Sequence, residues 1–482
     1  MGKPNYFVAI DIGTSFIKGA LLDLDRRQLL HIQRQPFPDP VANLAANFFE
    51  VDPDTLVVTI RSLLDSLLGL APDCLGIVTC TQMHSLVLTD THYHPLSNLI
   101  TWRDQRAVLP HPSGEGTYFD QLLSRLTDED LAALGGGLRA GLPVGTLFWM
   151  AQNQLLPTQE AIPLTLSEFV MTQLCGTDSS SQVESSSWPN NQQTIKPLIE
   201  PTNAAAYGAY NVEQGDWHYD VLTKLGLAHL KWPEVGSIHS ITGYVHRNGR
   251  PIPCYSSVGD HQCALAGAFL QQRELSLNIA TGAQASLITP HLKLGNYETR
   301  PYFDQRFINT IVKIPAGRSL TLLVDLITEL ASPGNPEQRD PWALIATAVE
   351  AVPQTDLQIN LAFYDSQDGA TGSITNIRED NLNVGHLFRA AVQNMAENFY
   401  ECAVRISDAP TDWEQIVFSG GLVTKFDALR AAILHQFQSA HRLCLQEEDT
   451  LLGMLVLALT INGQAETVAE ATRLLANSEQ NS

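Results

Sequence analysis

The sequence lacks several patterns that mark common nucleotide-binding, metal-binding and membrane proteins. It contains no GxxxxGK[ST] and no GxGxxG segment, which excludes a P-loop and a dinucleotide-binding fold. Its seven cysteines are scattered and form no CxxC pair, which argues against a zinc ribbon and a disulfide framework. The longest apolar run, near residues 451–461, is too short to span a bilayer and predicts a buried helix.

Positive charge is also scarce. The 29 Lys and Arg residues face 51 Asp and Glu residues, giving a formal net charge of −22. This balance argues against nonspecific binding to nucleic acid or to an anionic membrane. An anionic nucleotide remains compatible with it, because Mg²⁺ and backbone amides can offset a distant acidic surface. Scattered cysteines are typical of a reducing compartment, so we expect a cytoplasmic protein.

The length and composition indicate a large folded chain with more than one core. At 482 residues, with 44% hydrophobic and 17% charged residues, the chain predicts two large domains or up to four smaller ones. The main boundary is expected in the Gly- and Pro-bearing segment 240–254, which is only weakly periodic. The clearest expected elements are a hairpin over 6–23, strands at 75–79, 85–89 and 416–418, helices over 386–406 and from 427, and a Ser-rich loop at 177–191.

One short internal similarity connects the two halves. The segment AIDIGTS at residues 9–15 aligns with LNIATGA at residues 277–283, and both predict a strand, a turn and a second strand. Two related halves that face a shared cleft would explain the similarity. A strand followed by a Gly/Thr turn is also a common hairpin, and this segment alone does not separate the two interpretations.

The hairpin turns carry the residue types that hold phosphates without a P-loop. Asp11, the turn Gly13-Thr14-Ser15 and Lys18 supply a carboxylate, hydroxyls, amides and a cation, and Thr281-Gly282 supplies a second turn. A carboxylate-bound Mg²⁺ together with turn amides and hydroxyls is sufficient to bind a nucleotide phosphate.

Five segments of the chain resemble motifs of one known family. DIGTSFIKGALLD, TQMHSLVLTD, GDHQCALAGA, NIATGAQASLI and FSGGLVTKFDAL occur in the order found in the FGGY carbohydrate kinases. That resemblance implies an α/β, two-domain ribonuclease H-like ATPase fold of the actin and hexokinase superfamily, with an interdomain cleft. It also implies a sugar-binding N-terminal FGGY domain over residues 1–245 and an ATP-binding C-terminal FGGY domain over residues 246–476.

Within the family the chain is most similar to the sedoheptulokinases. The stretches LITWRDQRA, LFWMAQN and YETRPYFDQRF and the segment 372–399 carry this similarity, although Asn376 stands where the family usually has Gly. It implies ATP-dependent phosphorylation of sedoheptulose to sedoheptulose 7-phosphate. The alternatives are a D-xylulose, D-ribulose or other polyol kinase of the same family, and an inactive regulator that binds sugar or nucleotide.

The resemblance places the general base at Asp260, in the motif Gly259-Asp260-His261-Gln262. Phosphoryl transfer to a sugar needs a carboxylate within hydrogen-bond reach of the attacking hydroxyl. An Asp directly before a predicted helix can instead serve as its N-cap. The intact Asp11 and Asp260 argue against an inactive regulator.

The resemblance also implies the residues that bind each ligand. The expected sugar contacts are Gln82, Met83, His84, Trp102 and Asp104. Core packing is the alternative for Met83, His84 and Trp102, and a solvated turn is the alternative for Asp104. The expected ATP contacts are Gly13, Thr14, Ser15, Lys18, Thr281, Gly282, Gly420, Gly421 and Lys425, with Asp11 as the Mg²⁺ carboxylate. The expected partners are the sugar and ATP, and the sequence is compatible with a homodimer.

Overall fold

The structure is a computed structural model that describes residues 5–175, 195–329, 340–363, 371–407, 409, 412–444, 446 and 448–479. The predicted Ser-rich loop at 177–191 lies outside these residues. The chain forms two compact units. The first contains Met1–Phe269, Arg300–Arg306 and Gln446–Ser482, and the second contains Leu270–Thr299 and Phe307–Leu445.

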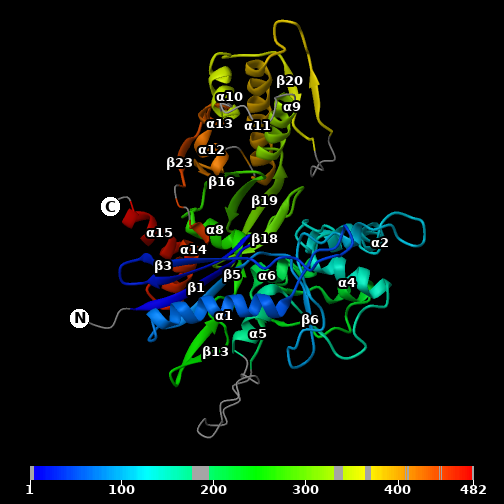
Figure 1. The fold of residues 1–482 in the computed structure, drawn as a ribbon, viewed down its shortest axis with the longest axis vertical. Coiled ribbons are helices and arrows are strands. Elements are labelled where there is room, and N and C mark those ends of the chain that lie inside the picture. The colour runs from blue at the N-terminus through cyan, green and yellow to red at the C-terminus, as the bar shows by residue number, and fades with distance from the viewer. Residues whose placement is uncertain are drawn as a thin grey trace. The chain divides into compact units, whose positions relative to one another are not determined.

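A seven-stranded mixed sheet forms the centre of the first unit (Figure 1). Its strands run in the order β13-β14-β5-β1-β2-β3, and β15 pairs with the end of β5. Their bounds are β1 (Tyr6–Ile12), β2 (Phe16–Asp23), β3 (Gln28–Pro36), β5 (Gly76–Thr81), β13 (Ile241–Arg247), β14 (Arg250–Tyr255) and β15 (Val258–Gly259). The antiparallel β1–β2 pair confirms the predicted hairpin, with β1 extending through Ile12 so that the turn consists of residues 13–15.

Helices pack on both faces of this sheet. Val8, Ile10 and Ile12 point to one face, where α1 (Pro53–Leu70) and α5 (Leu166–Cys175) cover them. Alternate residues point to the other face, which α14 (Asp449–Ile461) covers together with α8 (Asp260–Gly267). The buried apolar helix predicted near 451–461 is therefore confirmed as α14.

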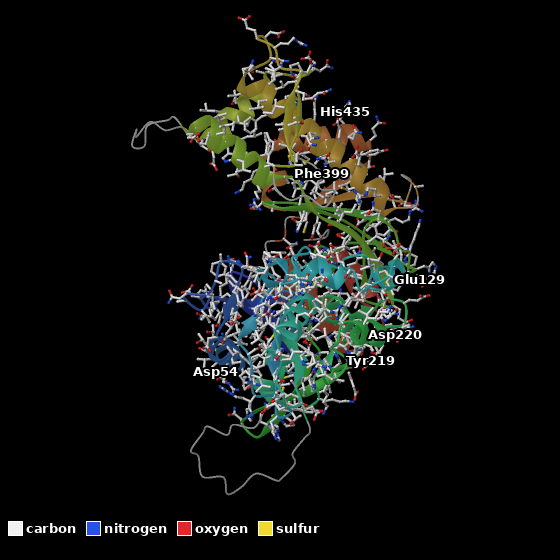
Figure 2. All side chains as sticks on the ribbon, turned by 90° about the vertical axis from the view of Figure 1, so that its right-hand side faces the viewer. Asp54, Glu129, Tyr219, Asp220, Phe399 and His435 are labelled. Carbon is white, nitrogen blue, oxygen red and sulfur yellow. The ribbon has the colours of Figure 1, made fainter. Side chains whose placement is uncertain are left out.

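Capping and amphipathicity explain where α1 begins and how it lies. The Asp52 side chain accepts a hydrogen bond from the Thr55 amide, and Pro53 occupies the first turn. Leu56 and its helical neighbours are buried, whereas Asp54 is exposed on the outer side of the helix (Figure 2). The negative charge of Asp54, in the first turn, also interacts favourably with the positive end of the helix dipole.

The remaining elements of the first unit connect these layers. They are β4 (Glu50–Val51), β6 (Val87–Thr89), β7 (Leu99–Ile100), α2 (Tyr118–Leu123), α3 (Asp128–Ala133), α4 (Pro143–Gln152), β8 (Ile162–Leu164), β9 (Leu198–Ile199), α6 (Pro201–Ala205), β10 (Tyr210–Asn211), β11 (Asp216–Trp217), α7 (Tyr219–Lys224), β12 (Glu234–Val235) and α15 (Val468–Glu479). Among the residues that the structure describes, no helix is long and apolar enough to cross a membrane.

The second unit has its own six-stranded sheet, in the order β18-β19-β17-β16-β22-β23. Its elements are β16 (Glu274–Ile279), β17 (Ala283–Thr289), β18 (Glu298–Tyr302), β19 (Arg306–Ile314), α9 (Gly317–Thr328), α10 (Pro341–Glu350), β20 (Gln358–Asn360), β21 (Ser373–Thr375), α11 (Val384–Ile406), β22 (Gln415–Ser419), α12 (Gly421–Lys425), α13 (Asp427–Phe437) and β23 (Ala440–Leu443). The predicted helical stripe of α11 is confirmed: Met395 and Phe399 are fully buried in the core of this unit. Phe399 is labelled on this helix in Figure 2.

The two sheets share one central arrangement. In the first, β1 pairs antiparallel with β2 and parallel with β5. In the second, β16 pairs antiparallel with β17 and parallel with β22. Asp11 and Asn278, which the sequence alignment matched, therefore lie on strands with equivalent neighbours in the two cores. The internal similarity reflects two topologically related sheets rather than two unrelated hairpins.

The first unit extends beyond the predicted boundary at residues 245/246. β13 and β14 form a hairpin that crosses this position, and β14 and β15 join the first sheet beside β5. The chain also returns to the first unit at residue 446, where α14 packs against α8. The boundary segment has weak periodicity because it is an edge hairpin of the sheet, not a linker.

The departure from the family pattern at residue 376 has a backbone explanation. Asn376 has a φ of 59°, in the left-handed region where Gly is the least strained residue. Asn tolerates this conformation better than most residues, and its Nδ2 donates to the Asp356 carbonyl at 2.6 Å. Position 376 therefore has a backbone conformation that both Gly and Asn accept.

Candidate active site

Three parallel strands of the first unit end at the same edge of the sheet. In register, Ile12 of β1 lies beside Thr81 of β5, and Thr81 lies beside Gly259 of β15. The next residues along the three segments are Gly13, Gln82 and Asp260. The carboxyl ends of parallel strands are the usual ligand-binding edge of an α/β sheet. The topology therefore brings together three predicted site residues that lie far apart in sequence.

Asp260 is the first residue of α8, and Gly259 is its N-cap, so the predicted alternative of an Asp260 N-cap is wrong. Burial raises the pKa of Asp260 to about 7, and the nearby carboxylate of Asp11 raises it further, while the amide of His261 and the guanidinium of Arg300 oppose this shift. A carboxylate with a pKa near neutrality is well matched to accepting a proton at physiological pH. The geometry is consistent with a general base, and the role itself stays a prediction.

Asp11 lies within a group of charged side chains from three segments. Its Oδ2 is 3.1 Å from Lys18 Nζ and accepts a hydrogen bond from Thr450 Oγ1 at 2.6 Å. Lys18 also contacts Glu448 Oε2 at 3.2 Å, and these two carboxylates raise its pKa against the opposing effect of burial. Burial raises the pKa of Asp449 to about 6, with Asp11 and Glu448 adding to the effect. Lys18 is thus held by carboxylates.

This acidic group has the chemistry that Mg²⁺ requires. Mg²⁺ is held in kinases through one or two carboxylates and substrate phosphates, not by a closed cage of protein ligands. Asp11 and Asp449 supply hard oxygen donors. Burial is the main cause of the raised pKa of Asp449, and the nearby carboxylates of Asp11 and Glu448 add to it, a repulsion that a divalent cation would relieve. Within the described part of the chain, no cluster of His, Cys, Asp and Glu forms a self-sufficient metal site. The residues therefore fit a metal that arrives with the nucleotide.

A chain of hydrogen bonds connects the predicted sugar residues with the first turn. Trp102 Nε1 donates to Thr14 Oγ1 at 3.4 Å, and Thr14 Oγ1 donates to Gln82 Oε1 at 3.3 Å. Gln82 Nε2 in turn donates to the Gly13 carbonyl at 3.3 Å. Gln82 is buried, whereas Trp102 is 44% exposed and Ser15 is exposed. The indole ring is therefore available to a ligand, and the Gln82 amide supports the turn.

His84 adopts a backbone conformation that few residues other than Gly accept. Its φ is 61°, and its Nδ1 lies 2.7 Å from the Ala206 carbonyl. Arg139 Nη2 lies 2.8 Å from His84 Nε2, and because a guanidinium can only donate, Nε2 accepts and Nδ1 carries the proton. Burial and Arg139 hold the pKa of His84 well below its ordinary value. The ring is therefore neutral and orients Arg139.

A second Arg–His pair lies beside the predicted base. Arg300 Nη1 is 3.1 Å from His261 Nδ1, so His261 also accepts from a guanidinium and is neutral. Burial, with Arg300 as the second cause, lowers the pKa of His261 to about 3. Arg300 also opposes the rise in the pKa of Asp260. The charge of Arg300 thus partly offsets the surrounding carboxylates.

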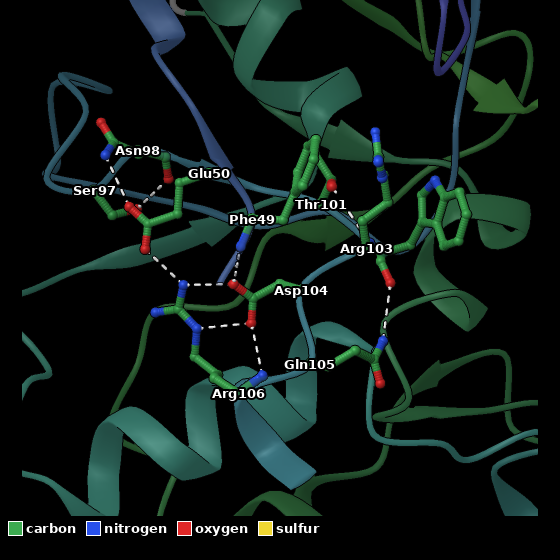
Figure 3. A network of polar contacts seen from close by, with 10 residues as sticks. Phe49, Glu50, Ser97, Asn98, Thr101, Arg103, Asp104, Gln105 and Arg106 are labelled. Carbon is green, nitrogen blue, oxygen red and sulfur yellow. Dashed lines mark hydrogen bonds and ion pairs between the residues drawn. The ribbon is translucent and has the colours of Figure 1, made fainter. Parts of the chain in front are cut away.

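Two predicted sugar residues are buried by local structure. A Cβ at Gly259 would lie 3.0 Å from Met83 Sδ, so Met83 packs directly against the backbone before Asp260. Asp104 is 1% exposed, and each of its oxygens accepts two hydrogen bonds. The four donors are the amide, Nε and Nη2 of Arg106 and the amide of Phe49, at 2.7–3.0 Å (Figure 3).

These bonds correct the prediction for Asp104. No lone-pair direction of its carboxylate remains for a sugar hydroxyl. Arg106 also contacts Glu50 at 2.6 Å, so Asp104 belongs to a buried ion-pair network that connects the 101–106 segment to β4 (Figure 3). The resemblance in LITWRDQRA implies sugar contacts at both Trp102 and Asp104, but the turn buries the Asp104 carboxylate while it leaves the Trp102 ring exposed.

The predicted nucleotide residues of the second unit gather at one end of its sheet. Thr281 and Gly282 form the exposed turn between β16 and β17, and Gly420 follows the parallel strand β22. Gly420 has a φ of 93°, and a Cβ there would lie 2.5 Å from the Ile279 carbonyl. Gly421 begins α12, where an added Cβ would meet nothing within 4 Å. Lys425 is exposed at the end of this helix. The ATP role of all five stays a prediction.

Sequence reasoning missed several residues that the fold places beside the predicted ones: Arg139, His261, Arg300, Glu448, Asp449 and Thr450. Arg300 lies inside the quoted stretch YETRPYFDQRF, and the acidic run before the apolar helix α14 marks residues 448–450. Neither signal specifies a partner, because Lys18 and Glu448 are separated by 430 positions in the sequence. Arg139 has no local signal.

Known proteins similar to this chain indicate its family. Residues 6–267 match the N-terminal domain of the FGGY family of carbohydrate kinases. The sedoheptulokinase of Mus musculus is 23% identical over 366 residues, covering 71% of this chain and 69% of that protein. The sedoheptulokinase of Homo sapiens is 21% identical over 404 residues, covering 75% of this chain and 76% of that protein.

The same fold occurs in solved structures. The xylulose kinase of Rhodospirillum rubrum superposes with a TM-score of 0.81 at 17% identity, covering 97% of this chain and 92% of that one. At such low identity the likeness shows the fold alone, which is an α/β fold shared with solved structures of sugar kinases. The chain belongs to the FGGY family of carbohydrate kinases. It is an ATP-dependent sugar kinase.

Proposed function

We propose that this kinase phosphorylates the terminal primary hydroxyl of a ketose, with sedoheptulose as substrate and sedoheptulose 7-phosphate as product. The sugar binds in the first unit and the nucleotide in the second. The similarity to two sedoheptulokinases over most of the chain supports the choice of sugar. The observation that carries the mechanism is Asp260, a carboxylate at the ligand-binding edge of the sheet with a pKa of about 7.

Asp260 acts as the general base in this mechanism. It accepts the proton of the sugar hydroxyl while that oxygen forms a bond to the γ-phosphorus of ATP, and the bond from phosphorus to the β-phosphate oxygen breaks to release ADP. Asp11 and Asp449 would hold Mg²⁺, which would neutralise charge on the phosphates. Lys18 and the hydroxyls of Thr14 and Ser15 contact the phosphates. Arg300 limits the repulsion between the base and the other carboxylates.

The sugar contacts follow from which groups are accessible. Trp102 offers an exposed ring to the apolar face of the sugar. Arg139, held by the neutral His84, donates to hydroxyls, because each guanidinium has five N–H donors. A site built to bond several hydroxyls discriminates against a shorter sugar, since its own polar groups would lose partners. Gln82 and Met83 are buried and support the residues that make these contacts.

A coupled ATP/ADP assay over a panel of sugars tests the proposal. The panel contains sedoheptulose, D-xylulose, D-ribulose and glycerol, and the position of the phosphate is read by NMR. We expect sedoheptulose to have the highest kcat/KM. If a shorter substrate exceeds it by tenfold or more, the choice of sugar is wrong and the kinase assignment stands.

The Asp260→Asn variant tests the mechanism in the same assay. It preserves the shape of the side chain, so the fold and the sugar KM should persist while kcat falls by roughly 10²–10⁴-fold. The matched control is Asp65→Asn, an exposed carboxylate on α1 paired with Arg247, which should leave kcat unchanged. A wild-type kcat in Asp260→Asn would contradict the assignment of the base.

A further inference from the structure

A buried polar network leads from the interior of the first unit to the residue before Asp260. The Thr202 side chain is fully buried, and its Oγ1 accepts a hydrogen bond from the Gly259 amide at 2.9 Å. Thr202 Oγ1 in turn donates to Glu200 Oε2, which also accepts from the Thr202 amide at 2.8 Å. The hydroxyl of Thr202 therefore bridges a buried carboxylate and the backbone at the end of β15.

The next residue of the same helix holds the same segment at a second point. Asn203 is 2% exposed, and its Nδ2 donates to the Ser257 carbonyl at 3.0 Å and to Ser167 Oγ at 3.2 Å. Ser257 Oγ donates to the Thr79 carbonyl of β5 at 3.2 Å. Residues 257–259 are thus fixed both to the sheet and to α6.

The far end of α6 contacts the other side of the candidate site. The Ala206 carbonyl, at the C-cap of this five-residue helix, accepts from Nδ1 of His84. That bond sets the neutral tautomer of His84, which orients Arg139. The short helix α6 therefore fixes the backbone before the predicted base Asp260 and also the ring of His84, which orients the proposed sugar contact Arg139.

The network is more polar than packing alone requires. Glu200 and Glu168 are both buried, and desolvation raises the pKa of each carboxyl, to about 7 for Glu200. Burying a carboxyl costs free energy unless hydrogen bonds compensate it. A Val at position 202 would fill nearly the same space but would leave the Gly259 amide without its partner and Glu200 Oε2 with one donor fewer, so the hydroxyl serves to bridge these two groups.

We propose that Thr202 is a positioning residue: its hydroxyl, held by Glu200, fixes the Gly259 amide and thereby the place of the Asp260 carboxylate. This inference rests on the proposed role of Asp260 as the base. When the Gly259 amide is released, the first turn of α8 gains freedom and water reaches the carboxylate. The hydroxyl of the sugar is then held less often at the distance that proton transfer requires.

The groups that face Asp260 determine how a change of position is detected. They are Asp11 on β1, Asp449 on α14, Arg300 on β18 and its neighbour His261, with the thiols of Cys80 and Cys263 close by. Burial is the main cause of the raised pKa of Asp260. Hydration of a loosened carboxylate must therefore lower this pKa toward its ordinary value.

The experiment compares Thr202→Val, which removes the hydroxyl at nearly constant volume, with Thr202→Ser, which retains it. The control is Thr472→Val on α15, a buried Thr whose hydroxyl donates to the Val468 carbonyl of its own helix. We expect Thr202→Val to lower kcat by about 10–100-fold with the sugar KM changed by less than threefold. Thr202→Ser should retain kcat within threefold, and Thr472→Val should retain it fully.

The pKa of Asp260 supplies a second measurement that needs no substrate. It is read by carboxyl ¹³C NMR titration, with Asp260→Asn to assign the resonance, and should fall by at least half a unit in Thr202→Val only. If Thr202→Val does not fold, Glu200→Gln tests the same bridge and should shift the pKa in the same direction.

The two measurements separate the inference from the proposed function. An unchanged Asp260 pKa in Thr202→Val, or a kcat loss matched by Thr472→Val, overturns the positioning role. A wild-type protein that phosphorylates no sugar in the panel overturns the proposed function, while the titration still decides whether Thr202 positions Asp260.

Discussion

The buried pair of Asp104 and Arg106 gives the sharpest test of the fold against the sequence-based prediction. Asp104→Asn keeps the size of the side chain but replaces one oxygen by an NH₂ group. Each oxygen accepts two hydrogen bonds from donors, so in either orientation the new NH₂ faces an N–H group. The variant also removes the negative charge of Asp104, one of the two carboxylates that pair with Arg106; the other is Glu50. Arg106 is only 4% exposed.

The magnitude follows from burial. Removing one partner of a buried ion pair costs about 3–5 kcal/mol, because the remaining charge stays desolvated. At ~2–4 °C of Tm per kcal/mol for large domains, the expected decrease in Tm is roughly 6–20 °C. Glu50 keeps one contact with the guanidinium, and the rings of Phe48 and Trp149 lie over it, which favours the lower half of this range.

The assay combines urea and thermal unfolding with steady-state kinetics measured well below the Tm. Asp65→Asn is the matched control, since its pair with Arg247 at 2.8 Å is largely exposed and worth at most about 1 kcal/mol. We expect Asp104→Asn to lose stability and to keep the sugar KM within threefold. A variant of wild-type stability with a tenfold higher KM would refute the structural role and restore the predicted sugar contact.

Three further predictions concern the two candidate ligand sites. Because a base works only when deprotonated, kcat/KM should rise with pH through about 7, the raised pKa of Asp260, and a rise centred near pH 4 would contradict this. The same raised pKa means that ionising Asp260 reduces folding stability as pH rises from its unfolded pKa of ~3.9 toward 7. Asp11→Asn should raise the Mg²⁺ concentration for half-maximal activity by about tenfold or more while the sugar KM stays constant, and an unchanged Mg²⁺ requirement would place Asp11 elsewhere. Gly420→Ala should lower the free energy of unfolding, measured in urea, by ~1–3 kcal/mol, because its φ of 93° and the close Ile279 carbonyl leave no room for a Cβ. Gly421→Ala should lower it by less than about 1 kcal/mol, and equal losses in the two variants would contradict the strain argument.

Local patterns predicted much of the fold. The first hairpin, the strands β5, β16, β17 and β22 and the helices α11 and α14 were expected from alternation or helical spacing, and each is present. The short match between residues 9–15 and 277–283 also predicted that the two units share a core. These features depend on residues within a few positions of one another, where backbone geometry ties spacing directly to structure.

The candidate site was predictable only in part. Asp11 lies near the end of β1, Thr14 lies in the turn after it, and Asp260 directly follows β15, so the family motifs at these strand ends were sufficient to predict them as candidates. Asp104 lies instead in a buried network: three of its four donors belong to Arg106, two positions away, and the fourth, the Phe49 amide, lies 55 positions away and reaches it beside the pairing of β4 with β7. No local pattern distinguishes a carboxylate that faces a ligand from one that faces an arginine.

By itself, the sequence determined the family, most of the helices and strands named above, and the sequence positions of the candidate site residues. Tertiary structure alone decided which polar groups meet: Lys18 with Glu448 across 430 residues, His84 with Arg139, and Thr202 with Gly259. It also decided that residues 446–482 return to the first unit. The physical reason is that periodicity is set along the chain, whereas burial and the partner of each polar group are set by which distant segments pack together.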